Sequence, residues 1–440
     1  MGSKGSLGST LFSTADLFVV LASAEFLRLM RPNREPRGRI WKINNWTRFF
    51  SIPPRILGRT TGVFQCKEIL MAKIFYSMAG EGRGHAVRVF TLVEHLRQEH
   101  ELVLFAPGDA YEFLVKSYGE GRAENVRLVR FPGLNFRYTG GKLDLFKSTA
   151  AAFKFARREM PALVDALRRR IDDEQPDLAI SDFEPCLPRA ARATNLPWMS
   201  LDHQHVLLAY DLSSLPYLLR RYAWWMSWAI RWYYGWNGYT PVASSFYTPP
   251  LKRGFEHVRQ VGPILRADVV SSIPRTGNFL VSYLRSNTPP AIIQSLADSG
   301  WPVRVYGLGQ QPPKGKLSFH AIDERRFVDD LAHCAGLVSA AGNQLLGEAL
   351  YFGKPVFAIP EDMHHEQQIN AHFLQQMGAG EWMTVDSFRS NRLVSFLSKL
   401  EVYREKLAPL AGRLNGTREA IAAIEQVLQK SQLPEITTLV

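Results

Sequence analysis

The sequence predicts an α/β protein of two domains, each built on a parallel sheet whose strands are joined by crossover helices. A chain of 440 residues, 46% of them hydrophobic, has room for two cores. Short apolar runs of strand length alternate with longer segments of helical periodicity. The alternation stops in a proline- and glycine-rich stretch near residue 250 and then starts again. We therefore expect a first domain at 71–250, a second at 251–432 and a tail at 433–440.

Residues 1–70 do not share this pattern. The apolar stretch 11–30 is interrupted by Asp16 and Glu25, which is unfavourable for a membrane span and for a signal peptide. The remainder is rich in proline, glycine and arginine, as linkers are. At Met71 a methionine stands just before the first strand-like run. The sequence thus predicts that the folded protein begins there and that residues 1–70 are a disordered tail or a mispredicted upstream extension. A membrane-tethering helix is the alternative.

The first domain opens with a strand at 73–78 and a glycine-rich turn into a helix at 85–99. Gly82 and Gly84 lie in this turn, where glycine lets the backbone approach a ligand and the helix start favours negative charge. We expect both to contact an acceptor or a phosphate. His85 begins the helix, and it either packs locally or lies at the mouth of a ligand site.

Strands are predicted next at 102–107, 126–131, 178–182 and 197–202, with a long basic helix at 145–172. Asp182 ends its strand, and polar residues at the carboxyl ends of parallel strands face the ligand crevice. A helix cap is its alternative role. His203 and His205 follow the last of these strands. Two such histidines would suit a metal, but no third ligand lies near them in the sequence, so we expect them to line an acceptor cleft and expect no metal site.

Residues 217–239 are rich in tryptophan and tyrosine, and Arg220, Ser227 and Arg231 share one helical face. Such a helix suits the headgroup region of an anionic membrane, and the net charge of +12 favours an anionic partner. Packing in the domain core and binding of an apolar acceptor are the alternatives. No nucleic-acid-binding module is recognisable, so no nucleic-acid partner is expected.

The alternation of the second domain begins with a strand at 279–286. Arg285, near the end of that strand, is either a pyrophosphate ligand or a surface cation. Strands at 303–309 and 317–322 and a helix at 327–336 come next. A last helix is predicted at 413–430.

The segment 336–372 carries the densest functional pattern. A strand at 336–340 breaks at Gly342 into a helix, and Gly353 closes that helix where a left-handed residue is common. The amides from Gly342 and Asn343 onward lie at the positive end of the helix dipole and have no partner within the helix. Such a helix start binds phosphate.

The residues that follow suit the rest of a nucleotide sugar. Glu348 lies about a turn and a half further along and can accept two hydrogen bonds from a ribose diol. Glu366, Gln367 and Asn370 suit the hydroxyl groups of a sugar. In order, the segment predicts contacts to phosphate, ribose and sugar.

This pattern resembles the donor-binding half of GT-B glycosyltransferases of families 1 and 28, the latter including the N-acetylglucosaminyltransferase of peptidoglycan synthesis. The matching positions are Gly342, Glu348, Gly353, Pro355, Glu366, Gln367, Gln368 and Asn370. The resemblance implies two Rossmann-like domains that face a cleft. It also implies a hinge at the Val-Gly-Pro tripeptide 261–263 and a last helix, 413–430, that packs back across the first domain. Ala340 stands where plant members place a phosphate-binding histidine, so the phosphates would rest on backbone amides, as in family 28.

The resemblance also implies roles in the first domain. In family 1 a histidine at the position of His85 is the catalytic base, and an aspartate at the position of Asp182 holds its tautomer. Many members place a proline three residues after that histidine, where this chain has Arg88. The combination SDFEP and SLDHQH is similar to an uncharacterised bacterial and archaeal branch related to family 28.

We therefore expect an inverting, metal-independent hexosyltransferase that uses a UDP-sugar as substrate and needs no cofactor. Its acceptor is unknown, and a lipid-linked or membrane-proximal one is expected. A UDP-sugar epimerase of the same fold and a non-catalytic sugar- or lipid-binding protein are the alternatives. The three cysteines, Cys66, Cys186 and Cys334, are few and far apart, which favours a reducing cytoplasm, with a peripheral place on the inner membrane face as a further expectation.

Overall fold

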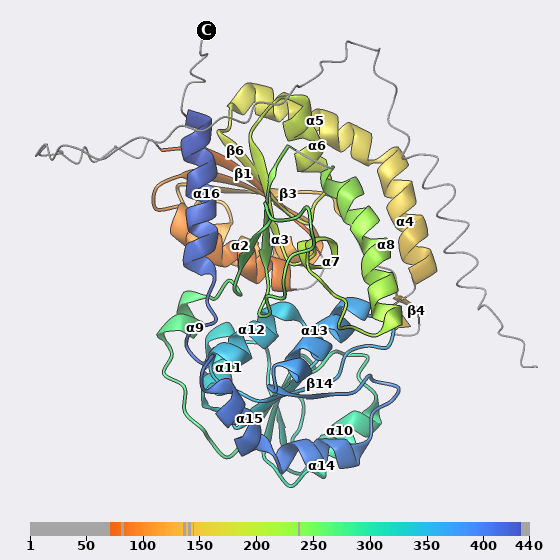
Figure 1. Ribbon diagram of the computed structural model, residues 1–440. Helices are drawn as coiled ribbons and strands as arrows, with labels where there is room; N and C mark the ends of the chain where they lie inside the picture. Colours follow the sequence, from red (N-terminus) through yellow and green to blue (C-terminus); the bar gives the residue numbers. More distant parts are fainter. Residues whose placement is uncertain are drawn as a thin grey trace, which may run out of the picture. The chain divides into compact units, whose positions relative to one another are not determined.

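The computed structural model describes residues 71–80, 83–134, 138–139, 142–143, 145–235 and 238–432 (Figure 1). The predictions for residues 1–70, for Gly82 and for the tail at 433–440 fall outside these residues. Within them the chain forms two α/β lobes, which confirms the predicted fold class.

The first lobe holds a parallel sheet with the strand order β3-β2-β1-β6-β7-β8-β9. Its strands are β1 (Lys73–Met78), β2 (Glu101–Ala106), β3 (Val126–Arg130), β6 (Leu178–Asp182), β7 (Trp198–Asp202), β8 (Thr240–Ser244) and β9 (Arg259–Val261). The central strands are buried along almost their whole length because helices cover both faces. This burial explains why they read as continuous apolar runs.

Two cores lie on the two faces of this sheet. Along β1, Ile74, Tyr76 and Met78 belong to one hydrophobic cluster and Phe75 to another, as the two-residue period of a strand requires. Helices α2 and α3 share the first cluster with the C-terminal helix, and α5 to α8 share the second. These helices are α2 (Arg83–Leu96), α3 (Gly108–Tyr118), α5 (Met160–Glu174), α6 (Cys186–Ala193), α7 (His205–Ala209) and α8 (Tyr217–Tyr234).

The long helix predicted at 145–172 is two helices, α4 (Leu145–Arg158) and α5, and the prediction of one helix was wrong. Pro161 lies at the start of α5, where its missing N–H is tolerated. In the middle of a continuous helix the same residue would remove a hydrogen bond and clash with the preceding turn. A short antiparallel pair, β4 (Tyr138–Thr139) and β5 (Lys142–Leu143), precedes α4.

The second lobe holds a parallel sheet with the strand order β12-β11-β10-β13-β14-β15. Its strands are β10 (Leu280–Tyr283), β11 (Val303–Tyr306), β12 (Leu317–Phe319), β13 (Gly336–Ser339), β14 (Val356–Ala358) and β15 (Gly380–Trp382). Its helices are α9 (Ala267–Ser271), α10 (Pro290–Ala297), α11 (Glu324–His333), α12 (Asn343–Tyr351), α13 (His365–Gln376), α14 (Ser390–Leu397) and α15 (Leu400–Leu407). The strand order reverses between β10 and β13, where ligands bind in open α/β sheets.

The first lobe extends beyond the boundary predicted at residue 250. After Pro249 and Pro250 the chain makes a short loop and returns as β9, which pairs with β8 in the first sheet. The two prolines end the segment after β8 but not the lobe, because the last strand of the first sheet ends at Val261.

The last helix, α16 (Thr417–Gln432), packs against the first lobe, as predicted (Figure 1). Ala420, Ala423, Ile424 and Leu428 join the cluster that contains α2. His100, after α2, also contacts the carboxylate of Glu425 through Nε2 at 3.0 Å. The chain thus crosses between the lobes twice, once before α9 and once before α16.

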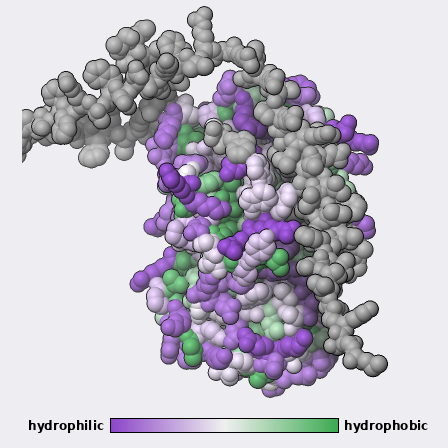
Figure 2. Space-filling model, turned by 45° about the vertical axis from the view of Figure 1, so that its right-hand side comes forward, coloured by the Kyte–Doolittle hydropathy of each residue, from purple (hydrophilic) through white to green (hydrophobic). Residues whose placement is uncertain are grey.

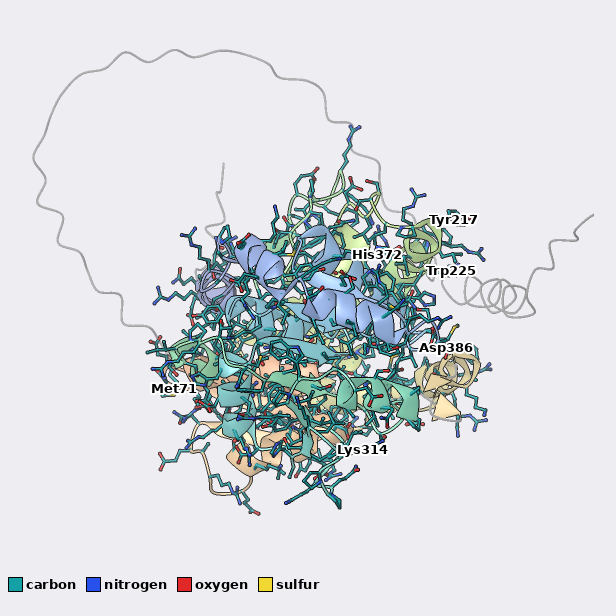
Figure 3. The ribbon with its side chains drawn as sticks, turned by 90° about the horizontal axis from the view of Figure 1, so that it is seen from below. Met71, Tyr217, Trp225, Lys314, His372 and Asp386 are labelled. Carbon is teal, nitrogen blue, oxygen red and sulfur yellow. The ribbon has the colours of Figure 1, made fainter. Side chains whose placement is uncertain are left out.

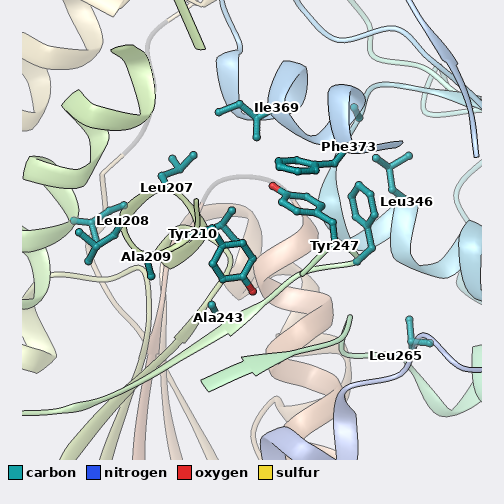
Figure 4. Packing of buried hydrophobic residues seen from close by; sticks show 14 of the residues in the cluster. Leu207, Leu208, Ala209, Tyr210, Ala243, Tyr247, Leu265, Leu346, Ile369 and Phe373 are labelled. Carbon is teal, nitrogen blue, oxygen red and sulfur yellow. The ribbon is translucent and has the colours of Figure 1, made fainter. Parts of the chain in front are cut away.

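The lobes meet through buried side chains. The ring of Tyr247, which follows β8, stacks on Phe373 of α13 with ring centroids 4.0 Å apart and an interplanar angle of 11° (Figure 4). Away from such contacts the surface is mixed: on the face shown in Figure 2, hydrophobic residues of the described part are scattered among hydrophilic ones.

Candidate active site

His85 and Asp182 lie side by side at the carboxyl end of the first sheet. Strands β1 and β6 are neighbours, with Met78 opposite Asp182, and α2 begins shortly after β1. This arrangement places Nδ1 of His85 2.8 Å from Oδ1 of Asp182. The Asp182 side chain is fully buried, whereas 16% of the His85 side chain is exposed. The imidazole therefore stands between a buried carboxylate and the surface.

Arg88, one helical turn after His85, holds the same carboxylate. Its Nε donates to Oδ2 of Asp182 at 2.9 Å and its Nη2 to Oδ1 at 2.6 Å. Burial by itself would lower the pKa of Arg88, but the carboxylate of Asp182 more than reverses this effect and raises the pKa above its usual value. The guanidinium thus stays charged although only 3% of the residue is exposed.

The contact with Asp182 favours one tautomer of His85. A lone pair on Nδ1 would face the carboxylate oxygen at 2.8 Å, so the proton belongs on Nδ1, where it donates to Oδ1. Arg88 Nη2 also lies 3.1 Å from Nδ1 and would donate to it in the other tautomer, but the lone pair of Nδ1 would then face the charged Oδ1 at 2.8 Å. No hydrogen bond within the described part of the chain reaches Nε2. Nε2 therefore carries the lone pair that a general base needs.

The start of α12 lies next to this group. Strand β13 ends at Ser339, and Gly342 caps α12 with extended backbone angles. A Cβ placed on Gly342 would meet no described atom within 4 Å, so the space beside this glycine is open. On Gly84 a Cβ would lie 3.9 Å from Cβ of Gln344, which places the turn before His85 against the first turn of α12. Gly353 has φ of +67°, as predicted for the residue that closes the helix.

Asn343 and Asn370 take part in the contact between the lobes. The Asn343 amide lies near the backbone of Ser244 and Phe246, with both hydrogen bonds at 3.4 Å. Asn370 is fully buried, and its Oδ1 accepts a hydrogen bond from the hydroxyl of Tyr247 at 3.0 Å. Both residues thus join the second lobe to the end of β8 and the loop after it.

Glu348, the predicted ribose ligand, is 2% exposed and already holds partners. Arg266, in the linker before α9, donates from Nε to Oε1 at 3.1 Å and from Nη2 to Oε2 at 2.8 Å. Gln344 adds a third hydrogen bond to Oε1 at 3.1 Å. The carboxylate has about four lone-pair directions, so roughly one remains free, whereas the prediction had two hydrogen bonds from a ribose diol.

Glu366 and Gln367 lie in the first turn of α13. Gln367 is buried, and its Oε1 accepts a hydrogen bond from the backbone of Glu361 at 3.2 Å. Burial and then the charge of Glu366 raise the pKa of Tyr222 and of Tyr247, which places Glu366 near the first lobe.

His203 is 3% exposed, and its ring contacts residues of both lobes. Its Nδ1 donates to the carbonyl of Ser244 at 2.9 Å, and its Nε2 lies 3.0 Å from Oδ1 of Asn370. His205 is fully buried in a separate network, where Nδ1 contacts the Asp202 carboxylate and Nε2 the hydroxyl of Tyr239. The two predicted acceptor residues therefore serve different networks.

Arg285 lines a cavity of about 270 Å³ at the carboxyl ends of β10, β13 and β14. Its Nη1 lies 3.0 Å from Oε1 of Glu361, and 42% of its side chain is exposed. Ala340 and Ile359 form apolar parts of the wall. This cavity lies at the reversal point of the second sheet, where a ligand is expected.

Known proteins identify the family. The sequence profile of glycosyl transferase family 1 matches residues 72–401. The chain belongs to this family. The glycosyltransferase is 25% identical over 405 residues to an uncharacterized glycosyltransferase of Methanosarcina mazei, covering 81% of this chain and 98% of the relative. A second one, from Methanosarcina acetivorans, is 25% identical over 400 residues with the same coverage.

Solved structures show the GT-B fold of the glycosyltransferase. Arabidopsis thaliana UGT89C1 in complex with UDP-L-rhamnose superposes with a TM-score of 0.60 at 16% identity, covering 82% of this chain and 100% of the other. MurG of Acinetobacter baumannii gives a TM-score of 0.52 at 14% identity, with coverage of 81% and 99%. The family profile thus shows family 1, and the solved structures show the predicted GT-B fold.

Sequence reasoning did not assign a role to Arg88 or Arg266 of the glycosyltransferase. Two signals could have indicated Arg88. It stands where many family members have a proline, and its spacing of three residues from His85 places both side chains on one helix face. Arg266 gave no such signal, because its partner Glu348 lies 82 residues away in the sequence.

Proposed function

We propose that the glycosyltransferase moves a sugar from a nucleotide sugar, a UDP-sugar above all, to an acceptor hydroxyl with inversion at the anomeric carbon. The observation that carries this proposal is the position of the His85–Asp182 pair next to the first turn of α12. The close approach of Gly84, directly before His85, to Gln344 of α12 indicates this position. A base for the acceptor and a phosphate site for the leaving group would then lie at one place between the lobes.

In this mechanism Nε2 of His85 takes the proton from the acceptor hydroxyl, and the acceptor oxygen forms a bond to the anomeric carbon. The bond from that carbon to the diphosphate breaks on the opposite face, and the diphosphate leaves with the electron pair. Asp182 stabilises the imidazolium that results. The amides at the start of α12 and the guanidinium of Arg285 offset the charge on the diphosphate, so the proposal needs no metal ion.

Replacement of His85 by alanine tests the base. We expect transfer to fall by at least about a hundredfold, the lower end of the effect of general-base catalysis, while donor binding measured by calorimetry stays unchanged. Asp182→Asn should reduce transfer with the same pattern. Unchanged transfer in His85→Ala would refute the role of this residue, and turnover of the donor without any acceptor would favour an epimerase.

The donor is identified by its effect on thermal unfolding. UDP-N-acetylglucosamine, UDP-glucose and GDP-mannose are the first candidates, and a ligand that binds only the folded state raises the unfolding temperature. We expect a UDP-sugar to give the largest shift. A protein that none of these compounds stabilises would contradict the proposed donor class.

We also propose that α8 rests on an anionic membrane face and brings the enzyme to a membrane-proximal acceptor. Tyr217, Leu218 and Trp224 are more than half exposed, and Arg220 lies beside them. Tyr217 and Trp225 stand at the outer edge of the molecule in Figure 3. None of the helices described is long and apolar enough to cross a bilayer.

Vesicle sedimentation tests this contact. With vesicles that contain phosphatidylglycerol, Leu218→Ser combined with Trp224→Ser should reduce the bound fraction severalfold, because buried apolar area and charge attraction both contribute to binding. Val402→Ser, at an exposed residue of α15, is the matched control. Equal binding of all variants would exclude α8 as the contact.

A further inference from the structure

Four charged side chains of alternating sign link the predicted ribose site to the helix that carries His85. In order they are Glu348 of α12, Arg266 of the linker, Glu324 of α11 and Arg83 of α2, and we call them the ion-pair chain. Arg266 contacts Glu348 through Nε and Nη2, and its Nη1 donates to Oε2 of Glu324 at 2.6 Å. Oε1 of Glu324 accepts a hydrogen bond from Nη1 of Arg83, also at 2.6 Å.

The ion-pair chain crosses from one lobe to the other. Glu348, Arg266 and Glu324 belong to the second lobe and its linker, whereas Arg83 is the first residue of α2 and lies two positions before His85. Burial decreases along the chain, from 2% exposure at the Glu348 side chain to 37% at Glu324 and 40% at Arg83. Its inner end is therefore rigid, and its outer end lies in partial contact with water.

The inner end fixes the orientation of the Glu348 carboxylate, the predicted ribose ligand. A guanidinium fork that contacts both oxygens of a carboxylate prevents its rotation, which an ammonium group does not. Burial alone would lower the pKa of Arg266, but the charges of Glu348 and Glu324 more than reverse this and raise it, so the fork stays charged. The linker around it is also held, since Gln344 donates to the carbonyl of Ile264 at 2.8 Å.

We propose that the ion-pair chain is a positioning device for the donor, in which Arg266 orients Glu348 and Glu324 transmits the contact to Arg83 of the catalytic helix. The inference rests on the proposed function, since it assumes a ribose at Glu348. Within the described part of the chain, the ion pairs of Arg83 reach the predicted ribose ligand through Glu324 and Arg266. A change at Arg83 should therefore alter nucleotide affinity, although Arg83 itself contacts no predicted donor residue.

Calorimetry with UDP, which contains the ribose and the diphosphate, tests the inner end. We expect Arg266→Lys to weaken UDP binding about tenfold, because the lysine keeps the charge but loses the fork. Thermal unfolding of each variant checks that the fold is retained. If Arg266→Lys is poorly folded, Glu324→Gln tests the same device, because Arg266 then keeps its pair with Glu348.

A double-mutant cycle tests the connection between the lobes. Glu324→Gln and Arg83→Met should each weaken UDP binding about threefold, in the range expected for a half-exposed ion pair, and the double variant should be no weaker than Glu324→Gln alone. Glu112→Gln removes the carboxylate of an exposed pair with Arg130 and serves as the control with unchanged affinity.

The outcomes separate the two proposals. Unchanged UDP affinity in Arg83→Met, or additive losses in the double variant, would overturn the ion-pair chain while the proposed function stands. A wild-type protein that binds neither UDP nor GDP would overturn both.

Discussion

The Asp182 carboxylate contacts the side chains of both His85 and Arg88. The proposed role of His85 as a base depends on how the negative charge of this carboxylate is shared between them. In a simple pair, the whole negative charge of the aspartate would stabilise the imidazolium that forms if His85 takes up a proton, as proposed. Here Arg88 occupies both carboxylate oxygens and neutralises part of that charge. The same contacts prevent rotation of the Asp182 carboxylate. The proton therefore stays on Nδ1 of His85, and Nε2 keeps its lone pair. If His85 is the base, as proposed, Arg88 is a positioning residue that acts on it mainly through Asp182.

Substitution of Arg88 tests this role. Arg88→Lys keeps the charge but loses the fork, so we expect kcat to fall about tenfold while the KM for the donor is unchanged. Arg88→Met leaves a buried carboxylate without its counter-charge and should lower the free energy of unfolding by about 3–5 kcal/mol. Steady-state kinetics and urea unfolding measure the two effects. A fully active Arg88→Lys would show that any cation suffices.

Replacement of Glu348 by alanine should weaken nucleotide-sugar binding by about 1.5–3 kcal/mol, the range for hydrogen bonds to a charged group. The same change leaves Arg266 with only Glu324 as a partner, so part of the loss would come from the linker. Glu348→Gln separates the contributions, because it keeps the shape and one acceptor. Calorimetry that finds equal affinity for all three proteins would remove the ribose role.

The sequence predicts residues well where a local rule governs them. Gly342, Gly353 and Asp182 follow from the ends of strands and helices, and the structure places all three as expected. The partners of these residues depend on tertiary packing instead. Nothing local indicates that Arg266 reaches Glu348, or that His203 and Asn370, 167 residues apart, share a hydrogen bond between the lobes.

At the scale of elements, the end of α8 holds the residues that follow Asp182 in place. Its last residue, Tyr234, donates to Oδ2 of Asp202 at 2.6 Å and accepts a hydrogen bond from the backbone of Phe183, also at 2.6 Å. Phe183 directly follows Asp182 and has φ of +58°, a costly conformation for a bulky residue. The aromatic segment predicted to meet either core or membrane thus has a buried face that serves the site. Its interpretation as an apolar acceptor site stays a prediction.

Tyr234→Phe should therefore lower the free energy of unfolding by about 2 kcal/mol, because it removes a hydrogen bond to a buried carboxylate. Urea unfolding at pH 7 measures this loss. Tyr233→Phe is a matched control, since no hydrogen bond of its hydroxyl is recorded in the described part of the chain. Equal losses in both variants would contradict the role of the Tyr234 hydroxyl.

The same variant has a predictable dependence on pH. Burial alone would raise the pKa of Asp202, but the charge of His205 and the hydrogen bonds of His205 and Tyr234 more than offset it and lower the pKa. The stability from this group is therefore present above the unfolded pKa of about 3.9 and is lost as the pH falls through the lower folded value. Without the Tyr234 hydroxyl the folded pKa rises, so acid unfolding of Tyr234→Phe should begin at higher pH.

At the scale of the molecule, the path of the chain makes the lobes depend on each other. The first lobe is not a continuous segment, because α16 returns from the second lobe to cover α2 and the first sheet. The resemblance to GT-B enzymes predicted this return, but the lobe boundary near residue 250 could not be placed from the two prolines alone. The position of β9 is set by pairing with β8, which is a tertiary contact.

Truncation tests this dependence. A chain that ends at residue 418 keeps Gly416 and Thr417, which hold the linker, but loses the apolar face of α16. Ile424 and Leu428 are almost fully buried, and burial of each stabilises by about 1.5–3 kcal/mol. Their loss removes a large part of a typical stability of about 5–15 kcal/mol. We expect this chain to lose cooperative thermal unfolding, whereas a chain that ends at residue 432 should unfold like the full-length protein. If the shorter chain unfolded cooperatively at the full-length temperature, α16 would be an accessory of the first lobe and not part of its core.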